Sequence, residues 1–73
     1  MPTSTHLLAT ITRKADSIFK ENHGDVTKDN HAIYVENWFE VAAKFREEVA
    51  NEGLVKTVKE IDKIVEEQRK FCA

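Results

Sequence analysis

The chain is poor in residues that cross-link or interrupt a fold, with one cysteine, one proline and two glycines among its 73 residues. Cys72 has no second cysteine to pair with, so an intrachain disulfide is excluded. A lone thiol is typical of a reducing compartment, and we therefore expect a cytoplasmic protein. No run approaches the roughly 18 apolar residues that span a bilayer, so the sequence predicts no membrane segment.

A strong net charge is also missing. The formal net charge at neutral pH is −2, whereas a general polyanion binder is usually strongly basic. The composition, 41% hydrophobic and 33% charged, suits a folded helical chain rather than a disordered one. A length of 73 residues is enough for one domain, residues 1–73, and too short for two. So small a core contributes little net stability, so association with a partner subunit is expected.

Apolar residues recur with the helical period of about 3.6 residues along three segments. In the first segment, residues 5–22, they are Leu7, Leu8, Ile11, Ala15, Ile18 and Phe19. In the second, residues 29–51, they are Tyr34, Val35, Trp38, Val41, Ala42, Phe45 and Val49. Gly24 follows the first segment where a helix stop favours a positive φ, and Gly53 ends the second.

The third segment, residues 54–71, has a different spacing. Its seam advances by alternating steps of four and three residues, as in a heptad repeat, through Leu54, Val58, Ile61, Val65, Gln68 and Cys72. Val55, Ile64 and Phe71 widen this seam on its flanks. No stretch alternates cleanly enough to predict a strand. The sequence therefore predicts an all-α fold, a small three-helix bundle that homodimerisation through the C-terminal helix would complete.

Residues for catalysis are scarce. Nucleophilic catalysis needs a nucleophile, a base and an orienting group, but Cys72 is the only thiol and no histidine is near it in sequence. The three histidines, His6, His23 and His31, also lack the closely spaced ligand pairs of a zinc site. No glycine-rich phosphate loop or dinucleotide fingerprint is present. We expect no enzymatic activity, no catalytic residue and no cofactor.

The polar connection at residues 25–30 invites a test for calcium. Asp25, Thr27, Asp29 and Glu36 occupy positions one, three, five and twelve of a window that resembles an EF-hand loop. The resemblance covers only this window and fails at Asn30, which stands where the loop geometry requires glycine. The simpler interpretation is that Thr27, Asp29 or Asn30 caps the second helix. No metal is expected.

DNA binding is an alternative, because small three-helix domains often serve it. The turn at residues 51–54 would then join a supporting helix to a reading helix. However, the first turns of the third segment offer Lys56, Thr57, Lys59, Glu60 and Lys63, with no arginine or asparagine for bidentate contacts to bases. The second segment is acidic and would repel phosphates. Nucleic acid is therefore the second choice of partner.

Two helical surfaces are candidates for recognition. On the shoulder of the second segment's apolar stripe, Phe39 lies with Ala43, Arg46 and Ala50 in a candidate partner-binding patch. The opposite side of that segment carries the acidic Glu36, Glu40 and Glu47, which favour a protein partner with a basic surface.

In the third segment the polar Gln68 interrupts an apolar row, as residues that fix register in coiled coils do. The candidate dimer contact therefore comprises Val65, Gln68, Phe71 and Cys72. These patterns predict a small non-enzymatic regulatory or adaptor protein that acts by protein–protein interaction. The alternative is a DNA-binding transcriptional regulator that uses the third helix.

Overall fold

A computed structural model describes residues 4–72, which form three helices in the order α1 (Ser4–His23), α2 (His31–Asn51) and α3 (Val55–Cys72). Each helix contacts the other two, and the contact between α1 and α3 is the smallest. This confirms the predicted all-α three-helix bundle. Among the described residues, no helix is long and apolar enough to cross a membrane.

The two glycines end helices as predicted. Gly24 and Gly53 both have φ of 78°, a conformation that costs a residue with a side chain about 1–2 kcal/mol. The N–H of Gly24 donates to the carbonyl of Lys20 (3.1 Å), and the N–H of Gly53 donates to the carbonyl of Ala50 (3.0 Å). Both bonds satisfy carbonyl groups that the helix end would otherwise leave without partners.

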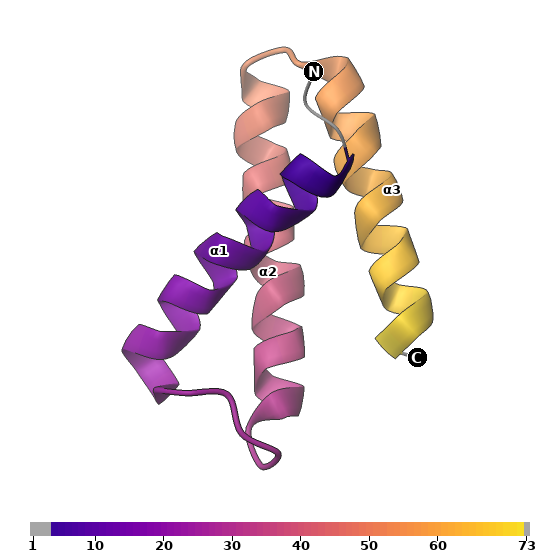
Figure 1. Cartoon of the computed structure of the whole chain (residues 1–73). Helices are drawn as coiled ribbons and strands as arrows, with labels where there is room; N and C mark the ends of the chain where they lie inside the picture. The colour runs from indigo at the N-terminus through magenta and orange to yellow at the C-terminus, as the bar shows by residue number, and fades with distance from the viewer. Residues whose placement is uncertain (1–3, 73) are drawn as a thin grey trace.

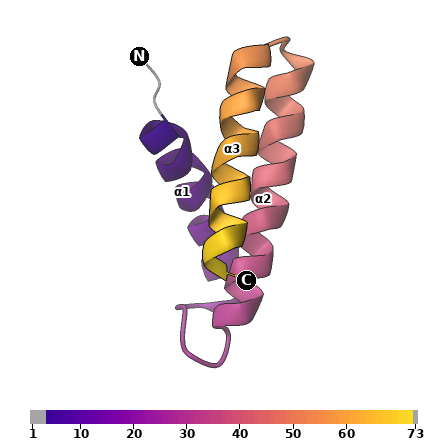
Figure 2. The same ribbon diagram turned by 90° about the vertical axis from the view of Figure 1, so that its right-hand side faces the viewer.

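The arrangement of the helices is uneven (Figure 1). Helices α2 and α3 run antiparallel and side by side, which the second view confirms (Figure 2). Helix α1 crosses α2 obliquely. As a result, α1 and α3 diverge toward the end of the bundle at which α2 begins.

The core lies where the three helices meet. Ile11 and Ile61 are its largest fully buried side chains, and Phe19 is buried separately against Tyr34, between α1 and α2. The other buried apolar residues are Leu7, Ala15, Trp38, Val41, Ala42, Val49 and Ile64. The buried positions of α1 and α2 all belong to the predicted stripes, because a helix buries one face at its own period.

Two predicted core positions are wrong. Ile18 is 40% exposed at the edge of α1, and Leu54, the residue before α3, is 49% exposed. Ile64, predicted to widen the seam on its flank, is buried at 4% exposure, whereas Val55 and Phe71, predicted to do the same, are 63% and 85% exposed. A heptad seam presupposes one partner helix, whereas α3 packs against two. Its buried face is therefore broader than the seam and centred elsewhere.

Candidate functional site

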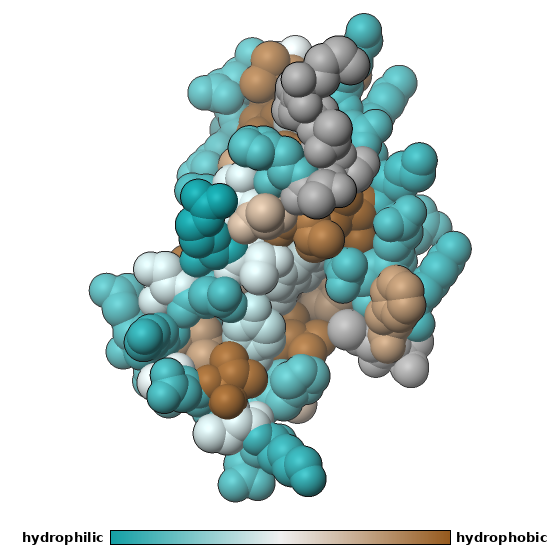
Figure 3. All heavy atoms as spheres, viewed as in Figure 1, coloured by the Kyte–Doolittle hydropathy of each residue, from teal (hydrophilic) through white to brown (hydrophobic). Residues whose placement is uncertain are grey.

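A groove opens where α1 and α3 diverge. Its floor is the N-terminal half of α2, and its volume is about 330 Å³. Side chains from all three helices line it: Leu8, Thr12, His31, Tyr34, Val35, Trp38, Phe39 and Gln68. In the space-filling view, pale and brown atoms fill the centre of this face between mainly hydrophilic flanks (Figure 3). The groove is thus the continuation of the α2 core stripe beyond the point where two helices cover it.

Two hydrogen bonds join the groove floor to its α1 wall. The indole Nε1 of Trp38 donates to Oγ1 of Thr12 at 3.1 Å. The hydroxyl of Tyr34 donates to the carboxylate of Asp16. Burial, together with this bond and the charge of Asp16, raises the pKa of Tyr34 to about 12. The phenol is therefore a neutral donor at physiological pH.

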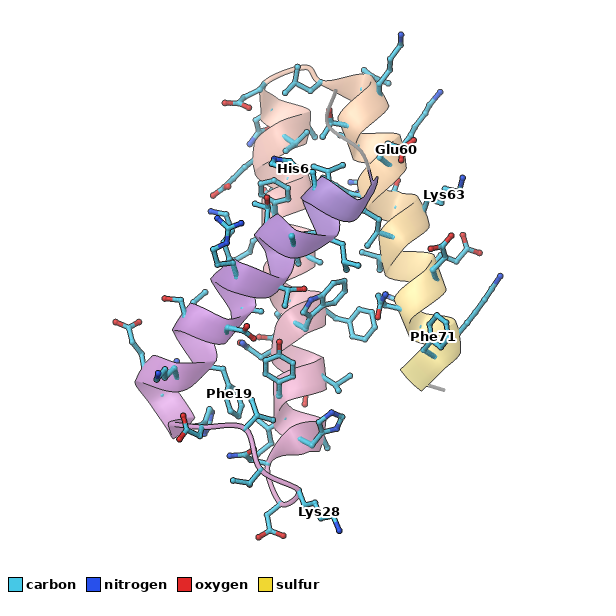
Figure 4. All side chains as sticks on the ribbon, in the orientation of Figure 1. His6, Phe19, Lys28, Glu60, Lys63 and Phe71 are labelled. Atoms are coloured by element: carbon cyan, nitrogen blue, oxygen red, sulfur yellow. The ribbon has the colours of Figure 1, made fainter. Side chains whose placement is uncertain are left out.

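Contacts between aromatic rings also hold the α1 wall and the floor of the groove in place. The ring of Tyr34 meets the buried ring of Phe19 edge to face, with centroids 5.3 Å apart, and Phe19 points into the space between α1 and α2 (Figure 4). Trp38 and Phe39 also meet edge to face, at 5.2 Å. Such pairs contribute about 0.5–1.5 kcal/mol beyond their burial. The floor of the groove is consequently held in shape before any ligand binds.

The α3 wall is less tightly held. The guanidinium of Arg69 lies 5.6 Å from the centroid of the Phe39 ring, a cation–π contact. Gln68 is half-buried beside it, and its side-chain amide makes no hydrogen bond within the described part of the chain. A ligand can satisfy a half-buried amide that forms no hydrogen bond with the described residues.

The predicted patch on α2 is divided between the groove and the α2–α3 seam. Phe39 lines the groove and is half-buried against the core. Arg46 is tied to α3, because its Nε donates to Asp62 at 2.6 Å and this pairing raises the pKa of Arg46. Ala43 and Ala50 are exposed. The four residues therefore do not form one free surface.

The acidic side chains Glu36, Glu40 and Glu47 are all exposed. At 100° per residue they lie on the side of α2 opposite Trp38, which faces the core and the groove. The structure therefore has two separate surfaces on α2, one apolar and concave and the other acidic and open to solvent.

The predicted dimer contact is only partly a free surface. Val65 is half-buried against the core, and Gln68 lines the groove. Phe71 is 85% exposed, the most exposed of the large hydrophobic side chains that the structure describes. The side chain of Cys72 lies outside the described residues.

The loop before α2 is held together by its own polar groups. The side-chain Oδ1 of Asn30 accepts a hydrogen bond from the N–H of Thr27 (2.6 Å), and its Nδ2 donates to the carbonyl of Asp25 (3.1 Å). Asn30 is the residue before α2, yet its side chain makes no capping bond to the helix. Glu36 lies inside α2, away from this loop. In residues 4–72 no three His, Cys, Asp or Glu side chains gather where they could hold a metal ion.

The packing of α2 against α3 differs from that of the helix-turn-helix on which the DNA-binding alternative depends. In a helix-turn-helix the two helices meet at roughly 90–120°, so that the second can enter the major groove. Here α2 and α3 form an antiparallel hairpin and lie alongside each other (Figure 2). Lys63 and Glu60 lie together on α3 (Figure 4), so the exposed side of this helix carries both signs of charge.

Comparison with known proteins gives no relative. No family model, no curated protein and no solved structure matches this chain.

The sequence pattern did not reveal the groove. Tyr34, Val35 and Trp38 were assigned to the core because they lie on the apolar stripe of α2, and Leu8 was assigned to the core of α1 for the same reason. Thr12 and His31 gave no signal of their own. The one available clue was that the three segments carry more apolar residues than three short helices can bury.

Proposed function

We propose that this protein is a non-enzymatic adaptor or regulatory protein that binds other protein chains through its helical surfaces. The observation that supports this is the groove, whose floor is the first half of α2 between the diverging helices α1 and α3. An amphipathic helix laid in an apolar groove buries side chains at positions i, i+3, i+4 and i+7. The lining of this groove, mostly aromatic and aliphatic with a few polar groups, is typical of binding sites.

The second surface supports the role of an adaptor. Glu36, Glu40 and Glu47 are exposed on the side of α2 opposite the groove. A partner with a basic surface would be steered to this side by charge. One copy of the chain would then contact two partners at once, one in the groove and one on the acidic side.

Self-association is part of the proposal. The last turns of α3 carry Gln68 in the groove wall and the exposed Phe71, and a chain of this size has little core with which to stabilise itself. We place the protein in the cytoplasm on the ground of its single thiol.

Selection from a library of helical peptides tests the proposal. Trp38 is the only tryptophan, so a change in its emission reports that a selected peptide occupies the groove. We expect peptides with an apolar stripe. His31→Glu, which places a charge in the lining, should weaken their binding by about tenfold or more.

Ala32→Glu is the matched control. Ala32 is the next residue, is exposed and is absent from the groove lining. Both substitutions add an acid to the first turn of α2, where the helix dipole favours it, so both variants should fold. If no peptide is selected, or if the two variants bind equally well, the groove is not the binding site.

A further inference from the structure

We infer that the groove is filled by a second copy of this chain: the last turn of α3, with Phe71 at its centre, docks into the groove of the other copy and receives that copy's turn in return. The inference rests on the proposed function, since it names the chain that occupies the same groove. The result is a symmetric dimer in which one surface patch meets itself.

The chain exposes more surface than is expected for a monomer of its mass. A folded monomer of 8.4 kDa is expected to expose about 4,600 Å², whereas this chain exposes 5591 Å². The excess of about 1,000 Å² is close to the roughly 800 Å² that each partner covers in a standard interface. The radius of gyration, 12.6 Å, also exceeds the value of about 11 Å expected for this length. One chain therefore exposes more surface than is expected for a compact monomer of its mass.

The position of Phe71 is the second argument. Its side chain is 85% exposed, and it lies one helical turn after Gln68, on the face of α3 from which Gln68 lines the groove. The ring lies on the same side of the molecule as the groove (Figure 4). The exposed Phe71 ring and the apolar groove are therefore neighbours, but the ring does not enter the groove of its own chain.

Two such surfaces complement each other when one copy is turned by a half rotation. Because ring and hollow are neighbours on one face, a two-fold axis between them brings each ring to the other copy's hollow. The hollow of about 330 Å³ exceeds the volume of about 150 Å³ that holds a benzene molecule. Tyr34, Trp38 and Phe39 line it and offer ring faces and edges for the entering phenyl group.

Gln68, on the α3 wall of the groove, also fits this two-fold arrangement. When each Phe71 enters the other copy's groove, the two Gln68 side chains come to lie between the two rings, close to the axis. Each amide carries both donors and an acceptor and has no hydrogen bond within the described residues of its own chain. Two amides across an axis satisfy each other, and a polar pair of this kind fixes the register of an interface.

The dimer would also regulate the proposed activity. A groove that holds the partner's Phe71 cannot hold the helix of another protein. The dimer is then the closed form, and a competing helix must be present at a concentration that displaces the second copy.

Sedimentation equilibrium of the full chain across the micromolar range tests the inference, with Phe71→Ala as the test variant. We expect a dimer for the unmodified chain and a dissociation constant raised at least about 100-fold by the substitution, because each dimer loses two buried phenyl groups, each worth about tenfold or more. Val55→Ala is the matched control: Val55 is also on α3 and 63% exposed, but it lies at the opposite end of the helix and outside the groove. Circular dichroism should show unchanged helicity for both variants.

Substitution of Gln68 tests the two-fold arrangement itself. Gln68→Glu and Gln68→Lys should each dimerise at least about tenfold more weakly, since like charges would face each other across the axis, and an equimolar mixture should restore association as a mixed dimer. A dimer that survives Phe71→Ala, a mixture that gains nothing, or a monomer at every concentration would overturn the inference. A monomer whose groove still binds selected helical peptides would do so while leaving intact the part of the proposed function that concerns the binding of other proteins.

Discussion

The hydrogen bond from Trp38 to Thr12 should stabilise the groove wall, and Thr12→Val removes it with little change in shape. Threonine and valine are both β-branched and similar in volume, so the helix and its packing are preserved. Trp38 is 7% exposed, and its Nε1 donates to Thr12 at 3.1 Å. The substitution leaves a nearly buried indole N–H without its acceptor, which costs about 1–2 kcal/mol.

The same helix supplies a matched control. The hydroxyl of Thr10 donates to the carbonyl of His6 at 3.0 Å in a hydrogen bond that is exposed to solvent. Thr10→Val removes one hydroxyl from α1 as well, but water replaces the lost contact, and a surface change of this kind costs less than about 0.5 kcal/mol. The difference between the two variants therefore isolates the buried bond.

Urea denaturation at one fixed protein concentration measures the effect. With a slope of about 1 kcal/mol per molar urea, Thr12→Val should lower the midpoint by roughly 1 M or more. That is a large share of the total of about 4–11 kcal/mol expected for this length. Equal midpoints for Thr12→Val and Thr10→Val would refute the reasoning, since they would mean that the indole N–H does not depend on Thr12.

Three further outcomes are expected. Tyr34 is the only tyrosine, so tyrosinate absorbance should titrate near its raised pKa of about 12. Asp16→Asn should lower that pKa without restoring the value of 10, because burial, the largest single cause, remains. Since the folded-state pKa of Tyr34 exceeds the unfolded value, the stability that this residue contributes is complete below pH 10 and is lost as the pH rises from about 10 to about 12. With solvent screening, this contribution to the free energy of unfolding is about 1 kcal/mol. A flat stability profile in that pH window would contradict the prediction. Phe19 is 1% exposed, so Phe19→Ala should destabilise the fold by about 3–5 kcal/mol. Phe39 is only half-buried, so Phe39→Ala should cost clearly less stability in thermal unfolding and should retain helicity. A loss of helicity would instead make Phe39 a core residue. Labelled duplex DNA at low salt should not be retained, and strong retention that salt abolishes would favour the DNA-binding alternative.

Much of the fold was predictable because helices reveal their buried face through spacing. The predicted ranges 5–22, 29–51 and 54–71 differ from the observed helices by at most two residues at any end. Gly24 and Gly53 stop their helices at a positive φ, for which few other residues are suited. Such features depend on neighbours within a few residues along the chain, so the sequence carries them directly.

The candidate site was much less predictable. Phe39 was singled out and does line the groove, but Ala43, Arg46 and Ala50 were grouped with it and lie elsewhere. The spacing that placed them together was correct for one helix. It could not show that Arg46 would be held by Asp62 across the α2–α3 seam.

The sequence by itself determined the number of helices, their limits and the stripe that each one buries, because these follow from local periodicity and capping. Only the tertiary structure decided how much of each stripe is covered. Helix α1 crosses α2 at an angle, so one half of the α2 stripe becomes core and the other half, with the half-buried Tyr34 and Val35, becomes the floor of an open groove. Crossing angles result from packing between distant segments, and therefore the same apolar pattern serves stability at one end of α2 and recognition, as we propose, at the other.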